Sequence, residues 1–102
     1  MRGMPIMTWN YRVFRKRTRI KQMNPHEPDH YEDSYHIHSV HYNKNGKICS
    51  ISSLSMAAHG YTEEELHLDI IKMADALKKS PLNWEDYQQP SDFAPTDDEL
   101  EI

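Results

Sequence analysis

The amino-acid sequence predicts a small α+β domain, in which a three-stranded antiparallel sheet carries one helix on one face. Segments with strand-like alternation, an Asn-Gly pair and one long amphipathic segment indicate the order β-β-β-α. A chain of 102 residues buries only a modest core, so one sheet with one helix is a realistic limit. We expect a single domain over residues 8–87, a flexible N-terminus at 1–7 and an acidic disordered tail at 88–102.

The first strand is expected to begin at Thr8. From there Trp9, Tyr11 and Val13 alternate with polar residues, which is the period of a half-buried strand. Residues 21–34 then combine two prolines with Asn, His, Glu and Asp, a composition typical of irregular backbone. We therefore expect a mobile loop at about 21–34.

The second and third strands are expected to form a tight hairpin. The second runs from about Tyr35 to Tyr42 and contains no glycine that would suggest a bulge. The Asn45-Gly46 pair after it is suited to the positive φ angles of a short turn. The segment "KICSISS" returns as the third strand, although its alternation of apolar residues and serines is imperfect at Ile48.

The helix is expected to span Thr62 to Lys79. Thr62 with Glu65 makes a capping box, and Pro81 prevents the helix from continuing. Apolar residues recur at intervals of three and four along it, at Leu66, Ile70, Met73, Ala74 and Leu77. We expect this stripe to be buried on one face of the sheet, which leaves the other face uncovered and partly apolar.

Composition excludes several classes of protein. Cys49 is the single cysteine, so the chain cannot form an internal disulfide or a thiolate metal cluster. The sequence has three glycines, no Gly-x-Ser-x-Gly motif and no glycine-rich phosphate loop. It also lacks a long apolar run or a secretory signal pattern. We expect a cytoplasmic protein without a cofactor, without membrane contact and without catalytic activity.

Three segments carry a resemblance to known proteins. They are "WNYRV" at 9–13, "YHIHSVHYNKNGK" at 35–47 and "GYTEEELHLDIIKMADALKKSPL" at 60–82. Together they resemble a family of short uncharacterised bacterial and archaeal proteins with no assigned function. The order of three strands and a Gly-x-Thr-x-Glu-Glu helix is also similar to the modules of HicB-type antitoxins, although their Pro-Gly-Cys turn is missing. That second resemblance implies a toxin partner by analogy of fold alone.

Three histidines lie close together in the second strand. Because side chains of a strand alternate, His36 and His38 project from one face and His41 from the other. His36 and His38 could hold zinc or nickel only if other groups, such as His26 and His30, completed the ligand set. The interpretation we prefer is structural, with His38 at the edge of the core and one ring nitrogen bonded to a backbone or carboxylate group.

Two functions are compatible with these features. An apolar sheet face and an unpaired strand edge favour a protein-interaction module that forms a homodimer. The alternative is nucleic-acid binding, for which the basic first strand supplies these candidates: Arg12, Arg15, Lys16, Arg17 and Arg19. Against the alternative stands the division of these groups between two strand faces, together with an overall charge of −4.

Overall fold

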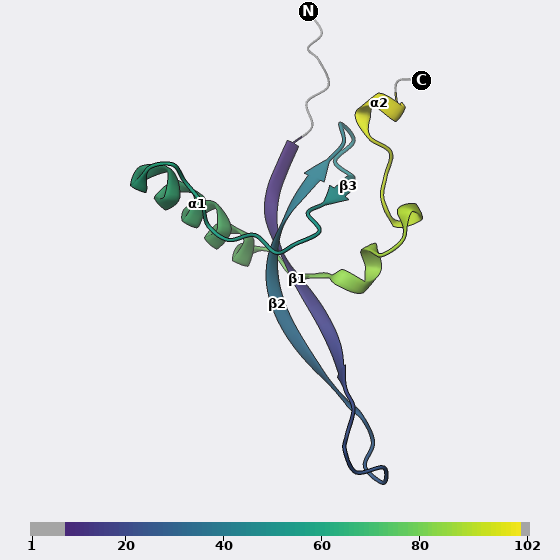
Figure 1. The fold of residues 1–102 in the computed structure, drawn as a ribbon. Helices are drawn as coiled ribbons and strands as arrows, with labels where there is room; N and C mark the ends of the chain where they lie inside the picture. The colour runs from purple at the N-terminus through teal and green to yellow at the C-terminus, as the bar shows by residue number, and fades with distance from the viewer. Residues whose placement is uncertain (1–7, 101–102) are drawn as a thin grey trace, which may run out of the picture.

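The computed structural model describes residues 8–100, so the predicted flexible N-terminus at 1–7 lies outside the described residues. The elements are, in chain order, β1 (Thr8–Ile20), β2 (His30–Tyr42), β3 (Ile48–Ile51), α1 (Glu63–Asp75), the 3₁₀ helix η1 (Ala76–Lys78), β4 (Leu82–Asn83), the 3₁₀ helices η2 (Trp84–Tyr87) and η3 (Pro90–Asp92), and α2 (Asp97–Leu100). Figure 1 shows α1 on one side of the strands and the segment after β4 on the other. No helix within residues 8–100 is long and apolar enough to cross a membrane.

The sheet has four strands in the order β3-β2-β1-β4. The α+β class is confirmed, and the first three strands are antiparallel and adjacent in chain order as expected. The prediction of three strands omits a fourth. The two residues of β4 pair in parallel with Phe14 and Arg15 of β1. The sheet is therefore mixed, and the chain crosses from its helix side to its other side through β4.

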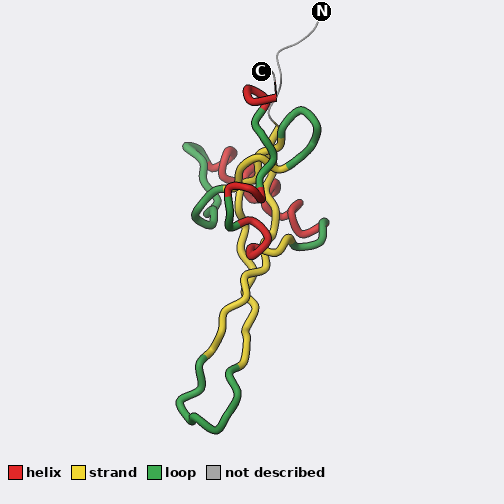
Figure 2. The backbone as a smooth tube through the Cα atoms, turned by 90° about the vertical axis from the view of Figure 1, so that its right-hand side faces the viewer, coloured by secondary structure: helices red, strands yellow, loops and turns green. Residues whose placement is uncertain are grey.

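The hairpin of β1 and β2 is longer than the sequence indicates. The two strands stay paired from Thr8↔Tyr42 to Ile20↔His30, so the predicted loop at 21–34 shrinks to nine residues, 21–29. Opposite charges face each other across this extension. Arg17 Nε lies 3.1 Å from Asp33 Oδ1, and Arg19 pairs with Asp29. The extension projects from the rest of the molecule (Figures 1 and 2). With the extension included, the principal axes measure 67 × 41 × 22 Å.

The turn between β2 and β3 follows the Asn-Gly prediction. Gly46 has a φ of 76°, and its backbone N–H donates to the carbonyl of Asn43 at 2.9 Å. The β2–β3 pairing has an irregularity that the sequence analysis did not expect. His41 pairs with Ser50 and Tyr42 with Ile48, so Cys49 has no partner opposite it. This extra residue changes the parity of β3 and explains its imperfect alternation.

Helix α1 packs on the face of the sheet that bears Tyr11 and Val13, which we call the first face. Only the C-terminal end of the helix makes this contact. Met73 and the following Ala76 are buried against Tyr11 and Val13. The rest of the predicted stripe is exposed, which makes that part of the prediction wrong; it comprises Leu66, Ile70, Ala74 and Leu77. The helix leaves the sheet instead of lying across it (Figure 1), so its N-terminal half has no apolar surface beneath it.

The second face of the sheet is covered, contrary to the prediction. Phe14 lies fully buried at its centre, with its ring edge-on to the rings of Trp84 and Tyr87 at 5.6 and 6.2 Å. Phe93 continues this contact, 5.9 Å from the ring of Tyr87. The aromatic residues of the C-terminal segment thus supply the second layer of the core.

Residues 88–100, which the sequence assigned to a disordered tail, follow the second face as far as the β2–β3 turn. Asn43 Nδ2 donates to the carbonyl of Pro95 at 2.9 Å, and the backbone N–H of Ala94 donates to Ile48 at 2.8 Å. Asp97 is buried and its Oδ1 accepts from the backbone N–H of Lys44 at 2.6 Å. Backbone and side-chain hydrogen bonds therefore hold a segment that contains few large apolar residues.

Candidate functional site

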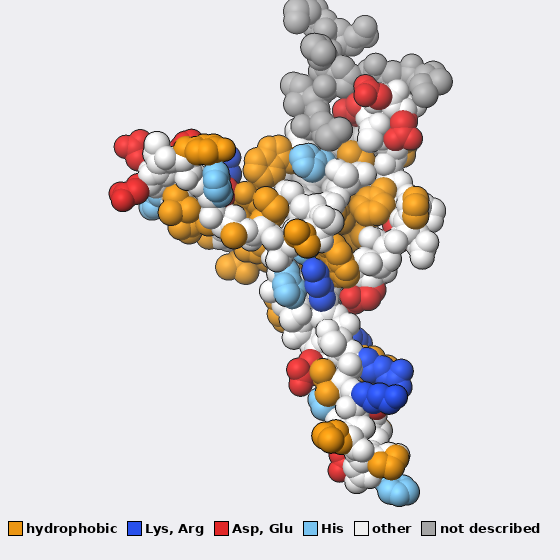
Figure 3. All heavy atoms as spheres, viewed as in Figure 1, with side chains coloured by type: hydrophobic (Ala, Val, Ile, Leu, Met, Phe, Trp, Pro, Cys, Tyr) orange, Lys and Arg blue, Asp and Glu red, His pale blue; other side chains and the backbone are white. Residues whose placement is uncertain are grey.

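Helix α1 and the η1 turn after it carry several apolar side chains that the fold leaves exposed. We call three of them the α1 stripe, which consists of Leu66 and Ile70 of α1 together with Leu77 of the 3₁₀ helix η1 that follows it. Their exposed fractions are 37%, 49% and 73%. Figure 3 shows hydrophobic side chains along this helix and acidic side chains at its outer end. A row of exposed apolar side chains on one side of a helix is a common feature of surfaces that contact another molecule.

The rotation of α1 about its axis is set by a polar contact with the sheet. The Tyr11 hydroxyl donates to Asp69 Oδ1 at 2.6 Å, and the backbone N–H of His59 donates to Asp69 Oδ2 at 2.8 Å. The hydrogen bond from Tyr11, and then that from His59, hold the pKa of Asp69 below its ordinary value. Because Asp69 faces the sheet, the α1 stripe lies to one side of this contact.

The N-cap at the start of α1 forms as the sequence predicts, but within residues 8–100 only one of the two hydrogen bonds of the predicted capping box is present. Thr62 is the N-cap, and its hydroxyl accepts from the backbone N–H of Glu65 at 3.1 Å. The first turn contains three glutamates and the last turn contains Lys72, a distribution that complements the helix dipole. The helix therefore has an acidic outer end and a basic inner end, and the α1 stripe runs between them.

The spacing of the α1 stripe is that of a helix–helix seam. Leu66, Ile70, Met73 and Leu77 follow one another at intervals of four, three and four residues. This is the a/d spacing of a heptad, in which the apolar side chains of two helices interlock. Met73 is the only one of the four that is buried within the chain, so three seam positions remain available.

The basic residues of β1 are engaged within the chain. Arg12 Nη2 donates to the carbonyl of Ser80 at 3.0 Å, and Arg15 Nη2 donates to Asn83 Oδ1 at 2.6 Å. The ammonium group of Lys16 lies 4.1 Å from the centre of the Trp84 ring. All three side chains thus attach the segment around β4 to the sheet.

The two outer basic residues belong to the hairpin extension. Arg17 pairs with Asp33, whose hydrogen bond and charge raise the pKa of the guanidinium, and Arg19 pairs with Asp29. Alternation along β1 divides the five nucleic-acid candidates between both faces, as the sequence analysis predicts. The structure therefore does not bring them together as one basic surface.

The histidine arrangement follows strand parity. His36 and His38 lie on the second face, where His36 Nε2 is 2.8 Å from the Ser34 hydroxyl. His38 is fully buried, and its Nδ1 lies 2.8 Å from the carbonyl oxygen of Ser52. The ring lies 4.6 Å from that of Trp84 and edge-on to Phe14 at 5.3 Å. The expected contact of one ring nitrogen with a backbone group is present, whereas the ring is fully buried instead of lying at the edge of the core.

Burial lowers the pKa of His38 below its ordinary value, and nearby Lys16 and His36 act in the same direction. The neutral ring donates from Nδ1 to the Ser52 carbonyl, which leaves Nε2 buried without a hydrogen-bond partner. Residues 8–100 contain no group of three or more His, Cys, Asp or Glu side chains arranged to hold a metal ion.

Sequence reasoning missed Asp69, which orients α1, and Asn43, which holds the C-terminal segment. Asp69 falls on the face of α1 that bears Leu66 and Met73, where a charged residue interrupts an otherwise apolar surface. A charged residue in this position could have indicated a polar contact between the helix and the sheet. Asn43 accepts from the backbone N–H groups of Asn45 and Lys47 and also contacts Pro95; nothing local in the sequence indicates this last contact.

Comparison of the chain with protein-family models, with curated proteins and with solved structures found no match. The resemblances noted in the sequence are neither supported nor opposed by this result.

Proposed function

We propose that the protein is an interaction module that self-associates by pairing the α1 stripes of two copies. The observation that carries this proposal is the exposure of Leu66, Ile70 and Leu77 at heptad spacing on a helix that leaves the sheet. The single chain leaves each of these three side chains more than one third exposed. A second helix with the same spacing would bury them.

The charge distribution favours an antiparallel pair. A two-fold axis through the middle of the stripe would set Leu66 of one copy against Leu77 of the other, with the two Ile70 side chains on either side of the axis. The acidic first turn of each helix would then lie beside the basic end of the other helix, which carries Lys72 and Lys78. The helix dipoles would also be opposed, and the contact would be closed and isologous.

Nucleic-acid binding is not proposed, because each candidate basic side chain already has a partner in the chain. A HicB-like role with a toxin partner rests only on the resemblance of the strand and helix order, and no contact in the structure favours it. Self-association needs neither a second protein nor a change in the fold.

The test is light scattering with size-exclusion chromatography on the intact protein over a range of concentrations. We expect the unaltered chain to form dimers and Ile70→Glu to be monomeric with an unchanged circular dichroism spectrum. Leu68→Glu is the matched control, because Leu68 is equally apolar, 57% exposed, and lies on the opposite side of the same helix.

A purely monomeric unaltered protein would overturn the proposal. So would equal loss of the dimer in Ile70→Glu and Leu68→Glu, since the contact would then not depend on the stripe. Moderate salt should weaken the dimer only slightly, because charge screening affects the helix ends and not the apolar seam.

A further inference from the structure

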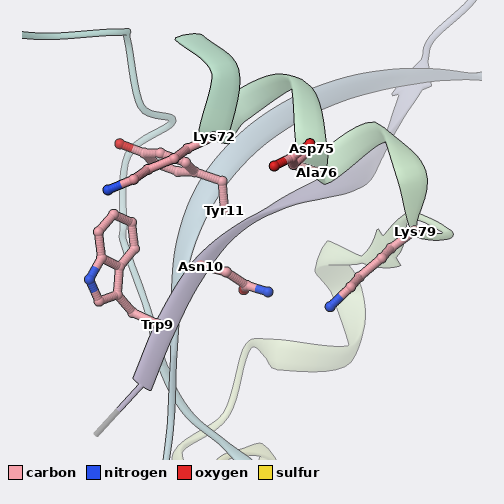
Figure 4. A pocket seen from close by; sticks show the side chains of 7 residues that line it. All are labelled: Trp9, Asn10, Tyr11, Lys72, Asp75, Ala76 and Lys79. Atoms are coloured by element: carbon pink, nitrogen blue, oxygen red, sulfur yellow. The ribbon is translucent and has the colours of Figure 1, made fainter. Parts of the chain in front are cut away.

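A pocket of about 360 Å³ lies between β1 and the C-terminal end of α1 (Figure 4). The residues that line it are Trp9, Asn10, Tyr11, Lys72, Asp75, Ala76 and Lys79. Ala76 is buried where the helix meets the strand, and its small side chain leaves space that a larger residue would fill. The volume is within the range of small-ligand sites.

One side of the pocket is apolar. Trp9 is 45% exposed, and its ring meets the buried Tyr11 ring edge-on at 5.2 Å. Burial, together with the hydrogen bond to Asp69, raises the pKa of Tyr11 to about 12. The Tyr11 hydroxyl is thus committed to Asp69, so the two aromatic rings offer an apolar wall without a free polar group from Tyr11.

The opposite side presents hydrogen-bond donors. Figure 4 shows the side chains of Asn10 and Lys79 extending toward each other from the strand and the helix end. Asn10 Oδ1 already accepts from the Tyr42 hydroxyl at 2.8 Å, which leaves the amide N–H groups to donate. Within residues 8–100, the Lys79 ammonium has no ion pair or hydrogen bond.

The charges around the pocket favour an anion. Lys72 adds a second positive group, 5.4 Å from the centre of the Trp9 ring. The one carboxylate of the lining, Asp75, lies 2.9 Å from the ammonium group of Lys78, which offsets its charge. Two converging donors beside an aromatic wall match a carboxylate with an apolar body.

We propose that this pocket binds an apolar carboxylate, with its carboxylate between Asn10 and Lys79 and its apolar body against Trp9. The carboxylate can come from a free small acid or from the C-terminus of an extended peptide. A peptide would lie along the β1 edge opposite β2, where the described pairing is limited to Phe14 and Arg15. The site faces the sheet, so it does not depend on pairing of the α1 stripe.

Titration followed by ¹⁵N NMR on the full chain tests the proposal, with phenylacetate as the small acid and acetyl-Gly-Gly-Phe as the peptide. We expect both to shift the Trp9 indole N–H and the Asn10 amide signals at millimolar concentrations. Phenylacetamide and the amidated peptide should bind at least about tenfold more weakly, because they lack the charge.

Lys79→Gln should weaken phenylacetate binding by about tenfold, whereas Lys47→Gln, an exposed lysine in the β2–β3 turn that does not line the pocket, is the control and should leave it unchanged. Tighter binding of the free peptide than of phenylacetate would identify a peptide C-terminus as the source, and the reverse would identify a free acid. Absence of shifts at Trp9 and Asn10, equal binding of the amides, or equal effects of the two lysine variants would each overturn the proposal.

Discussion

The two faces of the sheet are covered in different ways. On the first face, α1 touches the strands through Asp69, Met73 and Ala76, and the rest of its apolar surface is exposed. On the second face, a segment with little regular structure buries Phe14 and His38 completely. Strong helical periodicity therefore does not predict which segment forms the tighter contact with the sheet.

The difference follows from geometry. A helix that leaves the sheet at an angle makes contact over little more than one turn, whatever the length of its apolar stripe. An irregular segment can follow the sheet surface, and its aromatic side chains then reach several strands at once. Trp84 alone contacts His38 on β2 and both Phe14 and Lys16 on β1.

The largest effect should come from the second face. We expect Phe14→Ala to lower the free energy of unfolding by about 3–5 kcal/mol, because the ring is fully buried against His38, Trp84 and Tyr87. Tyr35→Ala is the control on a neighbouring strand, since Tyr35 is 60% exposed. Urea denaturation of both variants checks this, and similar losses would mean that the second face is not the main core.

An intermediate effect is expected on the first face. Met73→Ala should cost about 2 kcal/mol, because Met73 is the buried contact between α1 and the sheet but is packed from one side. Ile70→Ala should cost much less at low protein concentration, where the proposed dimer dissociates.

Denaturation at several protein concentrations separates these two contributions. A cost for Ile70→Ala that grows with concentration would indicate a role in self-association. A large cost that is independent of concentration would instead show that Ile70 is packed within the single chain.

The smallest effect concerns the pH dependence of the free energy of unfolding, to which His38 on the second face contributes. The pKa of His38 is lowered by burial in the folded state, whereas the unfolded chain titrates near the ordinary value of 6.5. As pH falls through 6.5, the unfolded state binds a proton that the folded state does not, so stability falls. The loss ends once pH passes below the folded pKa, and its slope is at most about 1.4 kcal/mol per pH unit.

Denaturant titrations between pH 5 and pH 8 on the intact protein and on His38→Asn provide the check. The variant keeps an amide N–H that can donate to Ser52, so it should fold but lose this part of the pH dependence. An unchanged pH profile in His38→Asn would assign the response to other histidines and would weaken the contrast between the two faces.

The sequence by itself determined the elements whose signals are local. The start of α1 depends on Thr62 and Glu65, three residues apart, and the β2–β3 turn depends on Asn45 and Gly46. The placement of His36 and His38 on one face of the sheet follows from strand geometry alone. The apolar residues of the α1 stripe were also identified correctly, although their burial was not.

Only the tertiary structure decided what those elements contact. The rotation of α1 depends on the hydrogen bond between Tyr11 and Asp69, which are 58 residues apart, and the path of the C-terminal segment depends on the contact of Asn43 with Pro95, 52 residues apart. Such contacts leave no periodic pattern, because each involves one residue at each end. The same periodicity of apolar residues is therefore compatible with a buried stripe and with an exposed one. The direction in which the helix leaves the sheet decides which of the two occurs.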